Sequence, residues 1–253
     1  MKKSFQALIA AALCLTATAP QAATFNIQVV FAGGLTLSQQ SAFAQAETYW
    51  ESVITGYQAG VSIPSLVITA LGNAIDGVGS ILGGAGPSAF STQAGYFLPT
   101  AGSMVFDIAD MPALELNGSF LDVIKHEMAH VMGFGTTWND NGVYTDGSGA
   151  FTGTHALAAY RAEFDPGANF VPVDIVSGPG TRDGHWAENW AGGTRELMTG
   201  FLDTPTFISN TTIQSFVDIG YSTTPVPLPA GAVLLLGGLG VLGAAGARRR
   251  RTE

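Results

Sequence analysis

The residues best suited to chemistry form a short motif near the middle of the chain, His126-Glu127-Met128-Ala129-His130. In a helix the two histidines stand one turn apart on one face, with Glu127 beside them. Zinc takes nitrogen ligands at about 2 Å, and two histidines at this spacing fit it without distorting the helix. A neighbouring glutamate can then take a proton from metal-activated water. The motif predicts a hydrolytic zinc site with ligands His126 and His130 and general base Glu127.

A catalytic zinc ion needs a third protein ligand. In most metzincins the helix motif continues as His-Glu-x-x-His-x-x-Gly-x-x-His. Gly133 matches the glycine, but Thr136 stands where the third histidine is expected, so this ligand must come from farther away. His155 and His185 are the two histidines that remain. Both stay open as ligands, although His155 is more typical of a residue at the start of a helix.

Two segments after this motif carry a resemblance to a known family. The run His185-Trp186-Ala187-Glu188 is followed by Arg195-Glu196-Leu197-Met198-Thr199. This order resembles the leishmanolysin-like metalloproteases, in which an insertion displaces the third histidine into a His-Trp segment that precedes Glu-Leu-Met. The likeness extends over residues 116–221, and no cysteine occurs where the eukaryotic relatives form disulfides. It implies a metzincin fold, His185 as third zinc ligand and Met198 as the Met-turn residue beneath the metal, not a ligand.

Two other polar features have open interpretations. The loop Asn139-Asp140-Asn141-Gly142 with Asp146-Gly147 offers oxygen ligands and glycines that suit Ca²⁺. Its spacing does not reproduce the twelve-residue helix-loop-helix pattern, so an ordinary turn-rich loop is the alternative. Glu188 either orients the ligand region or is a solvated side chain.

The N-terminal 23 residues have the three-part pattern of a secretory signal peptide. Lys2 and Lys3 precede an apolar run over residues 7–15, and small residues lead to a cleavage site near Ala23. Cys14, the only cysteine, lies within this segment. The exported protein would therefore have neither a thiol nor a disulfide, and packing or metal must stabilise it.

The C-terminal residues 224–253 carry a second targeting pattern. Val226-Pro227-Leu228-Pro229-Ala230 precedes an uncharged run over residues 231–247, which Arg248-Arg249-Arg250-Arg251 closes. An apolar run of this length just reaches across a bilayer, and the arginines predict that its far end is cytoplasmic. The order resembles the VPLPA variant of bacterial PEP-CTERM sorting tails, which implies a Gram-negative envelope and an exosortase-type processing enzyme as partner. A permanent single-span anchor is the alternative.

The charge of the central body excludes one class of partner. Its basic residues are Lys125, Arg161, Arg182 and Arg195, whereas all but one of the 19 acidic residues lie there. Nucleic-acid binding needs a basic face to contact phosphates. We therefore expect no nucleic-acid partner.

Hydrophobic patterning predicts the order strand, helix, strands and active-site helix. The resemblance implies that these form a zincin-like α+β fold with a mixed twisted sheet and a smaller C-terminal subdomain below the cleft. Strands are expected at 25–31, 65–71 and 103–108, and helices at 37–54, from 120 onward with an N-cap from Asn117-Gly118-Ser119, and at 211–219. The glycine-rich stretch 72–95 favours loops and a short edge strand. The catalytic domain, residues 24–223, would comprise an upper subdomain, 24–135, with sheet and zinc-binding helix, and a lower one, 136–223.

These inferences converge on an exported zinc-dependent endopeptidase. It would hydrolyse peptide bonds in a protein or peptide substrate with metal-activated water and a glutamate general base. The alternative, motivated by the sorting tail, is a non-catalytic zinc-containing module of the cell surface or matrix.

Overall fold

The computed structural model describes residues 24–224. The predicted signal peptide and the predicted sorting tail with its apolar segment lie outside the described residues. Within residues 24–224, no helix has the length and apolar character needed to cross a membrane.

A four-stranded sheet forms one half of the structure. Its strands run in the order β1 (Ile27–Phe31), β3 (Leu66–Asn73), β5 (Tyr96–Asp107) and β4 (Gly83–Gln93). The first three are parallel, and β4 pairs antiparallel with β5 at the edge. Buried and partly exposed residues alternate along β3, so one face of the sheet points into the core. The predicted mixed sheet of an α+β fold is confirmed.

The stretch 72–95 differs from its prediction. The expected loop and edge strand are both present, the loop at 74–82, but the edge strand β4 is not short: it is 11 residues long and pairs along β5 from Phe106 to Tyr96. Its glycine-rich composition concealed its length, because glycine is depleted in strands, whereas pairing along β5 supplies the backbone hydrogen bonds that maintain the strand. Pro87 is tolerated because β4 is an edge strand, and the register shifts just after it. The predicted strand at 103–108 likewise begins earlier, at Tyr96.

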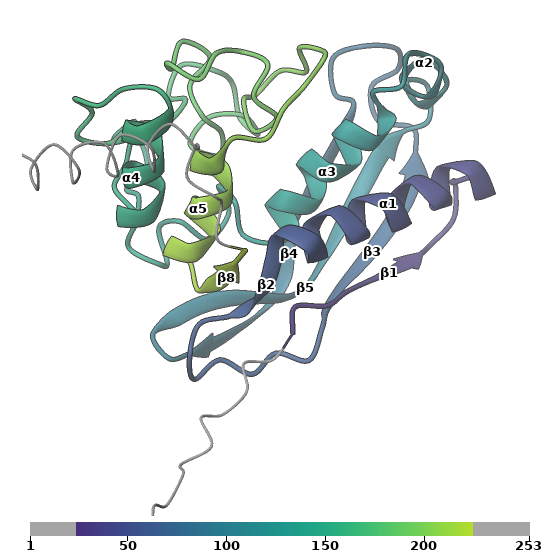
Figure 1. Cartoon of the computed structure of the whole chain (residues 1–253). Helices are drawn as coiled ribbons and strands as arrows, with labels where there is room; N and C mark the ends of the chain where they lie inside the picture. The colour runs from purple at the N-terminus through teal and green to yellow at the C-terminus, as the bar shows by residue number, and fades with distance from the viewer. Residues whose placement is uncertain (1–23, 225–253) are drawn as a thin grey trace, which may run out of the picture.

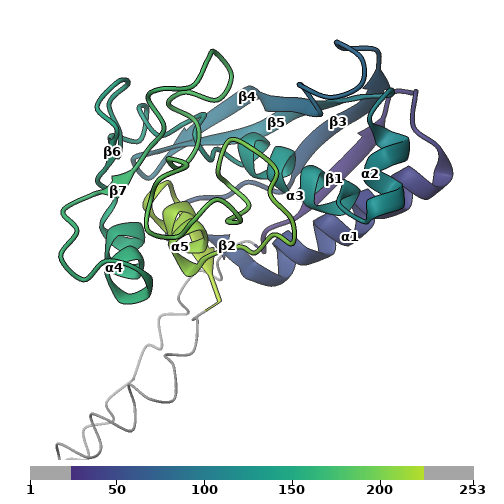
Figure 2. The same cartoon turned by 90° about the horizontal axis from the view of Figure 1, so that it is seen from above.

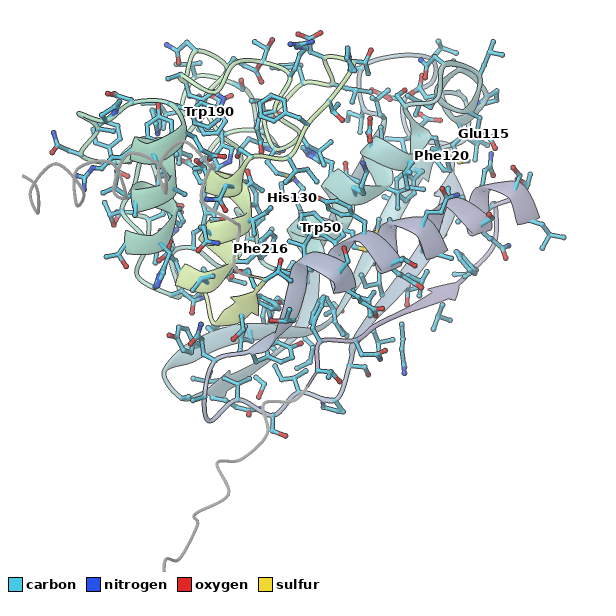
Figure 3. The ribbon with its side chains drawn as sticks, in the orientation of Figure 1. Trp50, Glu115, Phe120, His130, Trp190 and Phe216 are labelled. Atoms are coloured by element: carbon cyan, nitrogen blue, oxygen red, sulfur yellow. The ribbon has the colours of Figure 1, made fainter. Side chains whose placement is uncertain are left out.

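Helices α1 (Leu37–Val53) and α3 (Phe120–Val131) lie side by side on one face of this sheet (Figures 1 and 2). Thr36 and Gln39 form a capping box at the start of α1. The indole Nε1 of Trp50 donates to the carbonyl of Lys125 at 3.1 Å, which fixes α1 against α3. Trp50 also contacts Phe216, with ring centroids 5.3 Å apart (Figure 3).

The segment before α3 corrects two expectations. Between the strand predicted at 103–108 and the helix predicted from 120 onward, a short helix not among the predicted ones, α2 (Met111–Asn117), begins with Pro112 in its first turn, where the ring is tolerated. Ser119 occupies the N-cap position of α3 without a side-chain capping bond. Asn117 instead accepts from the backbone N–H of Ser119 at 3.0 Å.

The second half is mostly irregular. It contains α4 (Thr154–Glu163), α5 (Asn210–Asp218) and the small pair β6 (Ala150–Phe151) and β7 (Val171–Pro172), and α5 confirms the helix predicted at 211–219. Strand β8 (Tyr221–Thr223) returns to pair with β2 (Ile54–Tyr57), directly after α1. The buried core runs without interruption from Phe25 to Tyr221. The two halves therefore share one core.

Stacked indoles fill the second half in place of a sheet. Trp186 is fully buried and stacks on Trp138 at 5.1 Å and on Trp190 at 5.6 Å between ring centroids. Phe151 meets Trp186 edge-on at 5.5 Å. Aromatic side chains bury large areas and constrain geometry. This stack holds the segment that contains His185.

Candidate metal centre

Helix α3 presents His126, Glu127 and His130 as the sequence motif predicts. The helix ends at Val131, and the chain turns at Gly133, which has a φ of 113°. A Cβ at Gly133 would lie 2.6 Å from Thr137 Oγ1, so the turn requires glycine. Thr136, which stands at the usual place of a third histidine, donates from its hydroxyl to the carbonyl of His130 at 2.8 Å. It thus supports the end of the helix.

His185 reaches the same place from the second half of the chain. Gly135, with a φ of 72°, packs so closely that a Cβ there would lie 2.3 Å from the carbonyl oxygen of Gly184. The backbone of His185 accepts from the N–H of Asp174 at 2.9 Å. The N–H of Trp186 donates to the carbonyl of Met198 at 3.0 Å. Contacts on both sides therefore fix the position of His185.

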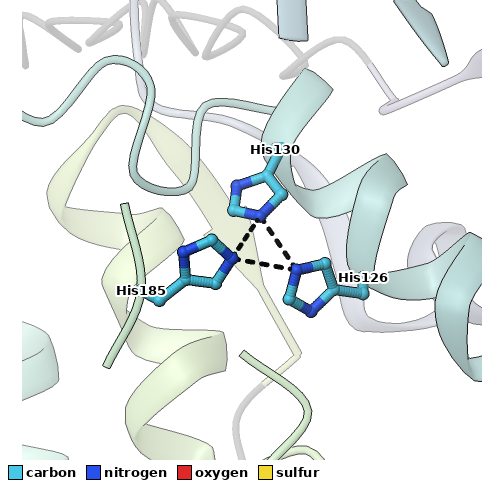
Figure 4. A group of neighbouring side chains, drawn as sticks. All are labelled: His126, His130 and His185. Atoms are coloured by element: carbon cyan, nitrogen blue, oxygen red, sulfur yellow. Dashed lines mark hydrogen bonds between the residues drawn. The ribbon is translucent and has the colours of Figure 1, made fainter. Parts of the chain in front are cut away.

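The three imidazole rings meet at their Nε2 atoms (Figure 4). The Nε2 atoms of His126, His130 and His185 form a triangle in which each pair is 3.0 Å apart. The opposite nitrogen of each ring bonds to a backbone carbonyl. The Nδ1–O distances are 2.6 Å to Leu197, 2.9 Å to Phe134 and 2.8 Å to Thr181, respectively.

These carbonyl contacts determine what the triangle can bind. A carbonyl only accepts, so each Nδ1 must carry the proton, and each neutral ring then has only a lone pair at Nε2. Three lone pairs pointing at one another repel, and a cation between them removes the repulsion. The centre of a triangle with 3.0 Å edges is closer to each corner than the about 2.0–2.1 Å that separates zinc from a histidine nitrogen. One ion can therefore contact all three Nε2 atoms at that distance. The residues present fit a metal ion.

Burial keeps the three rings neutral. Burial, with a smaller contribution from the neighbouring His185, lowers the pKa of His126 to about 3. Burial likewise holds the pKa of His130 well below the ordinary histidine value and lowers that of His185. Neutral imidazole is the form that binds metals. The site is thus prepared for a cation without prior loss of protons.

His155 does not belong to this centre. Within residues 24–224, the three histidines are the one group of His, Cys, Asp or Glu side chains close enough together to hold a metal ion. His155 lies at the start of α4, and its Nδ1 is 2.9 Å from a carboxylate oxygen of Asp218. Asp218 also accepts from the backbone N–H of His155 at 2.9 Å. The alternative ligand is therefore a helix-start residue.

Glu127 lines the same cleft as the histidines and is only 7% exposed. Burial raises the pKa of its carboxyl to about 8. A cation held by the neighbouring rings would lower this pKa again, because an opposite charge favours the carboxylate. A carboxyl whose pKa is raised by burial and lowered by a bound cation is suited to accept a proton and return it.

The segment Glu196–Thr199 supports two of the three rings. Leu197 supplies the carbonyl that holds His126, and Met198 supplies the one that holds Trp186, the neighbour of His185. Met198 is fully buried. Its place in the turn next to two of the histidines agrees with the position that the resemblance implies, whereas the Met-turn role stays a prediction.

Sequence reasoning assigned no role to Glu196, although its carboxylate organises this turn. It is 1% exposed, and it accepts from the N–H of Met198 at 2.7 Å. The other oxygen accepts from the N–H and hydroxyl of Ser209, both at 2.9 Å, and from the hydroxyl of Thr212 at 2.6 Å. Thr212 in turn accepts from the indole of Trp186 at 2.8 Å. The position of Glu196 beside Leu197 and Met198 was the one feature of the sequence that pointed to it. The sequence does not show which of its many carboxylates is buried.

The two open features have separate outcomes. Glu188 accepts from the N–H of Gly200 at 2.8 Å, so it supports the loop after the turn and makes no hydrogen bond to the imidazoles. In the loop proposed for calcium, the side chains of Asn139 and Asp146 bond to each other, and Asn141 bonds to the backbone of Phe97 at 3.0 Å. Calcium binding there stays a prediction.

A cleft of about 680 Å³ opens onto the histidines. It is lined by the start of β4 with the loop before it, residues 80–85, by residues 179–185, and by residues 197 and 199–202. The loop that precedes β4 is held in place by Asp107, which accepts from the N–H groups of Asp76 at 2.8 Å and Gly77 at 2.9 Å.

Comparison with protein-family profiles and with curated proteins finds no match to this chain. The functional argument therefore depends on the site itself.

Proposed function

We propose that the protein is a zinc-dependent endopeptidase of the leishmanolysin-like metzincin type. The observation that carries the proposal is the triangle of His126, His130 and His185 Nε2 atoms with Glu127 beside it in an open cleft. Three neutral imidazoles are a donor set that catalytic zinc uses, because a fourth position stays open for water or substrate. The order of the His-Trp segment and Met198 supports the family.

The cleft also favours a peptide substrate. Residues Gly83 to Ala85 of the edge strand β4 line it, and among the described strands only β5 pairs with β4. An extended peptide can therefore form backbone hydrogen bonds to the outer edge of β4, as in other cases of strand addition. Small side chains at the start of β4 let such a peptide approach closely.

The chemistry divides between metal and protein. Bound zinc would act as a Lewis acid that polarises a carbonyl group and makes water more acidic. His126, His130 and His185 would hold the ion, and their Nδ1–H bonds to carbonyls would orient them. Glu127 would accept the proton of the attacking water at its carboxylate and pass it to the leaving amine. Burial of Glu127 itself limits competing water around this carboxylate.

The proposed location of the activity rests on the sequence patterns at the two termini. We propose that the signal peptide exports the protein and that the C-terminal tail places it in the envelope, at the surface or outside a Gram-negative cell, after processing by an exosortase-type enzyme or as an anchor. Mass spectrometry of the mature chain from the native host would test this, since intact termini would contradict both processing steps.

Glu127→Gln tests the proposed function. We expect the purified, zinc-loaded variant to keep its metal and to lose at least about 100-fold in peptide hydrolysis, the scale of general acid–base catalysis. The assay is digestion of a broad peptide library, with a chelator control on the unchanged protein. Full activity of Glu127→Gln would contradict the mechanism. Bound zinc without chelator-sensitive cleavage by the unchanged protein would instead indicate the non-catalytic surface module.

A further inference from the structure

The cleft is lined by several acidic side chains and by one basic side chain. Besides the histidines, the ionisable residues that line it are Glu127, Asp146, Arg182 and Asp183. Arg182 is thus the one arginine or lysine in the lining. The other basic residues among 24–224 lie elsewhere: Lys125 pairs with Asp122 on α3, and Arg161 and Arg195 are absent from the lining. The Arg182 guanidinium is therefore the side chain of the lining that attracts a carboxylate, against the repulsion of Asp146 and Asp183 in the same lining.

The carboxylates of the cleft leave Arg182 without an acidic partner. Asp183 accepts from the N–H of Gly147 at 2.9 Å and from the hydroxyl of Tyr144. Asp146 accepts from the side chain of Asn139. The ion pairs within residues 24–224 are Lys125–Asp122 and His155–Asp218, so neither involves Arg182. Among the described residues, no carboxylate therefore forms an ion pair with this guanidinium.

The base of the Arg182 side chain is nevertheless held. Its Nε donates to the carbonyl of Ser177 at 3.1 Å, and its backbone N–H donates to Gly178 at 3.1 Å. The buried carboxylate of Asp174 fixes this loop by accepting from the N–H groups of Val176 at 2.7 Å and Ser177 at 3.0 Å. The two terminal nitrogens make no hydrogen bond to the described residues. A guanidinium anchored at Nε and open at its far side is arranged to bind a carboxylate.

We propose that Arg182 selects peptide substrates that carry an acidic side chain, which its guanidinium binds in the cleft three residues before His185. This inference rests on the proposed peptidase function. The acidic body would otherwise repel such substrates, so without Arg182 a neutral peptide would be cut at least as well. Because Arg182 is exposed, the preference should weaken as salt screens the pair.

Paired peptides test the inference on the full-length, zinc-loaded chain. In each pair, one position around the scissile bond carries either Glu or Gln, and kcat/KM is measured for both. We expect one position at which Glu is preferred by about fivefold, the scale of a partly exposed ion pair. Arg182→Gln should abolish the preference while the Gln peptide is still cut, and Arg182→Glu should reverse it, so that the Gln peptide is cut faster than the Glu peptide. Arg195→Gln removes an exposed arginine outside the cleft and should leave the preference unchanged.

The outcomes separate the two claims. A Glu preference that survives in Arg182→Gln, or its absence at every position, overturns the role of Arg182 while leaving the peptidase intact. Equal slowing of cleavage of the Gln and Glu peptides by Arg182→Gln is a further outcome. That result would mean that Arg182 supports the loop structure, and it would also contradict selection of acidic substrates by Arg182. If the unchanged protein cuts no peptide in a chelator-sensitive way, the proposed function fails and this inference fails with it.

Discussion

The two halves of the molecule position ligands of the same site by different means. In the first half, helical periodicity places His126 and His130 one turn apart, and a sheet with α1 supports the helix. In the second half, His185 lies outside any helix or long strand, and tertiary contacts with Gly135, Asp174 and the turn at Met198 fix it. The comparison teaches that two ligands are encoded locally, while the third depends on packing between distant segments.

The largest effect should come from removing the third ligand. We expect His185→Ala to reduce bound zinc from one per chain to nearly none and to abolish hydrolysis, because two histidines alone hold zinc weakly. Metal content after gel filtration, measured by plasma mass spectrometry, tests this. His155→Ala is the matched control and should keep both metal and activity. Equal zinc loss in His185→Ala and His155→Ala would contradict the assignment of His185, and not His155, as the third ligand.

The next effect concerns the buried carboxylate of the second half. Glu196→Ala removes the acceptor of four hydrogen bonds, so we expect the free energy of unfolding to fall by about 3 kcal/mol or more. Glu196→Gln retains one acceptor oxygen and should lose less. Urea unfolding of the zinc-loaded proteins measures both. A Glu196→Ala protein as stable as the parent would show that the turn does not depend on this residue.

A backbone change at Gly135 should weaken the metal site more than the fold. The added Cβ of Gly135→Ala must move Gly184 away, and His185 with it. We expect zinc affinity to fall by about tenfold or more, as for changes to groups that orient ligands. Competition with a fluorescent chelator gives the affinity. Gly142→Ala, at a positive φ of 68° but with open space around its Cβ, controls for backbone strain alone.

The smallest effect should follow from a local change in the first half. Thr36→Ala removes the hydroxyl that caps α1, and we expect a loss of about 1 kcal/mol in unfolding free energy. Zinc affinity should not change, because α1 carries no ligand. If Thr36→Ala lowers zinc affinity as much as Gly135→Ala does, the metal site depends on the capping of α1, and the two halves do not contribute independently.

The same contrast explains what sequence could and could not predict. The motif on α3, the strand at 25–31 and the helix at 211–219 follow from periodicity and were predicted. The length of the edge strand β4 was underestimated because its glycines weaken the strand pattern, and α2 was missed because its proline, which also suits a first helical turn, is typical of a helix breaker. The resemblance pointed to His185, but the carboxylate of Glu196 and the three carbonyls that orient the rings are products of tertiary structure.

The central claim is that His126, His130 and His185 hold one zinc ion through their Nε2 atoms. A crystal structure of the purified chain, with anomalous scattering measured on both sides of the zinc edge, tests it most directly. The account predicts one zinc ion per chain in contact with these three nitrogens at about 2.0–2.1 Å. Zinc bound at His155, or a metal-free site in zinc-supplemented crystals with the His185 ring turned away, would contradict it.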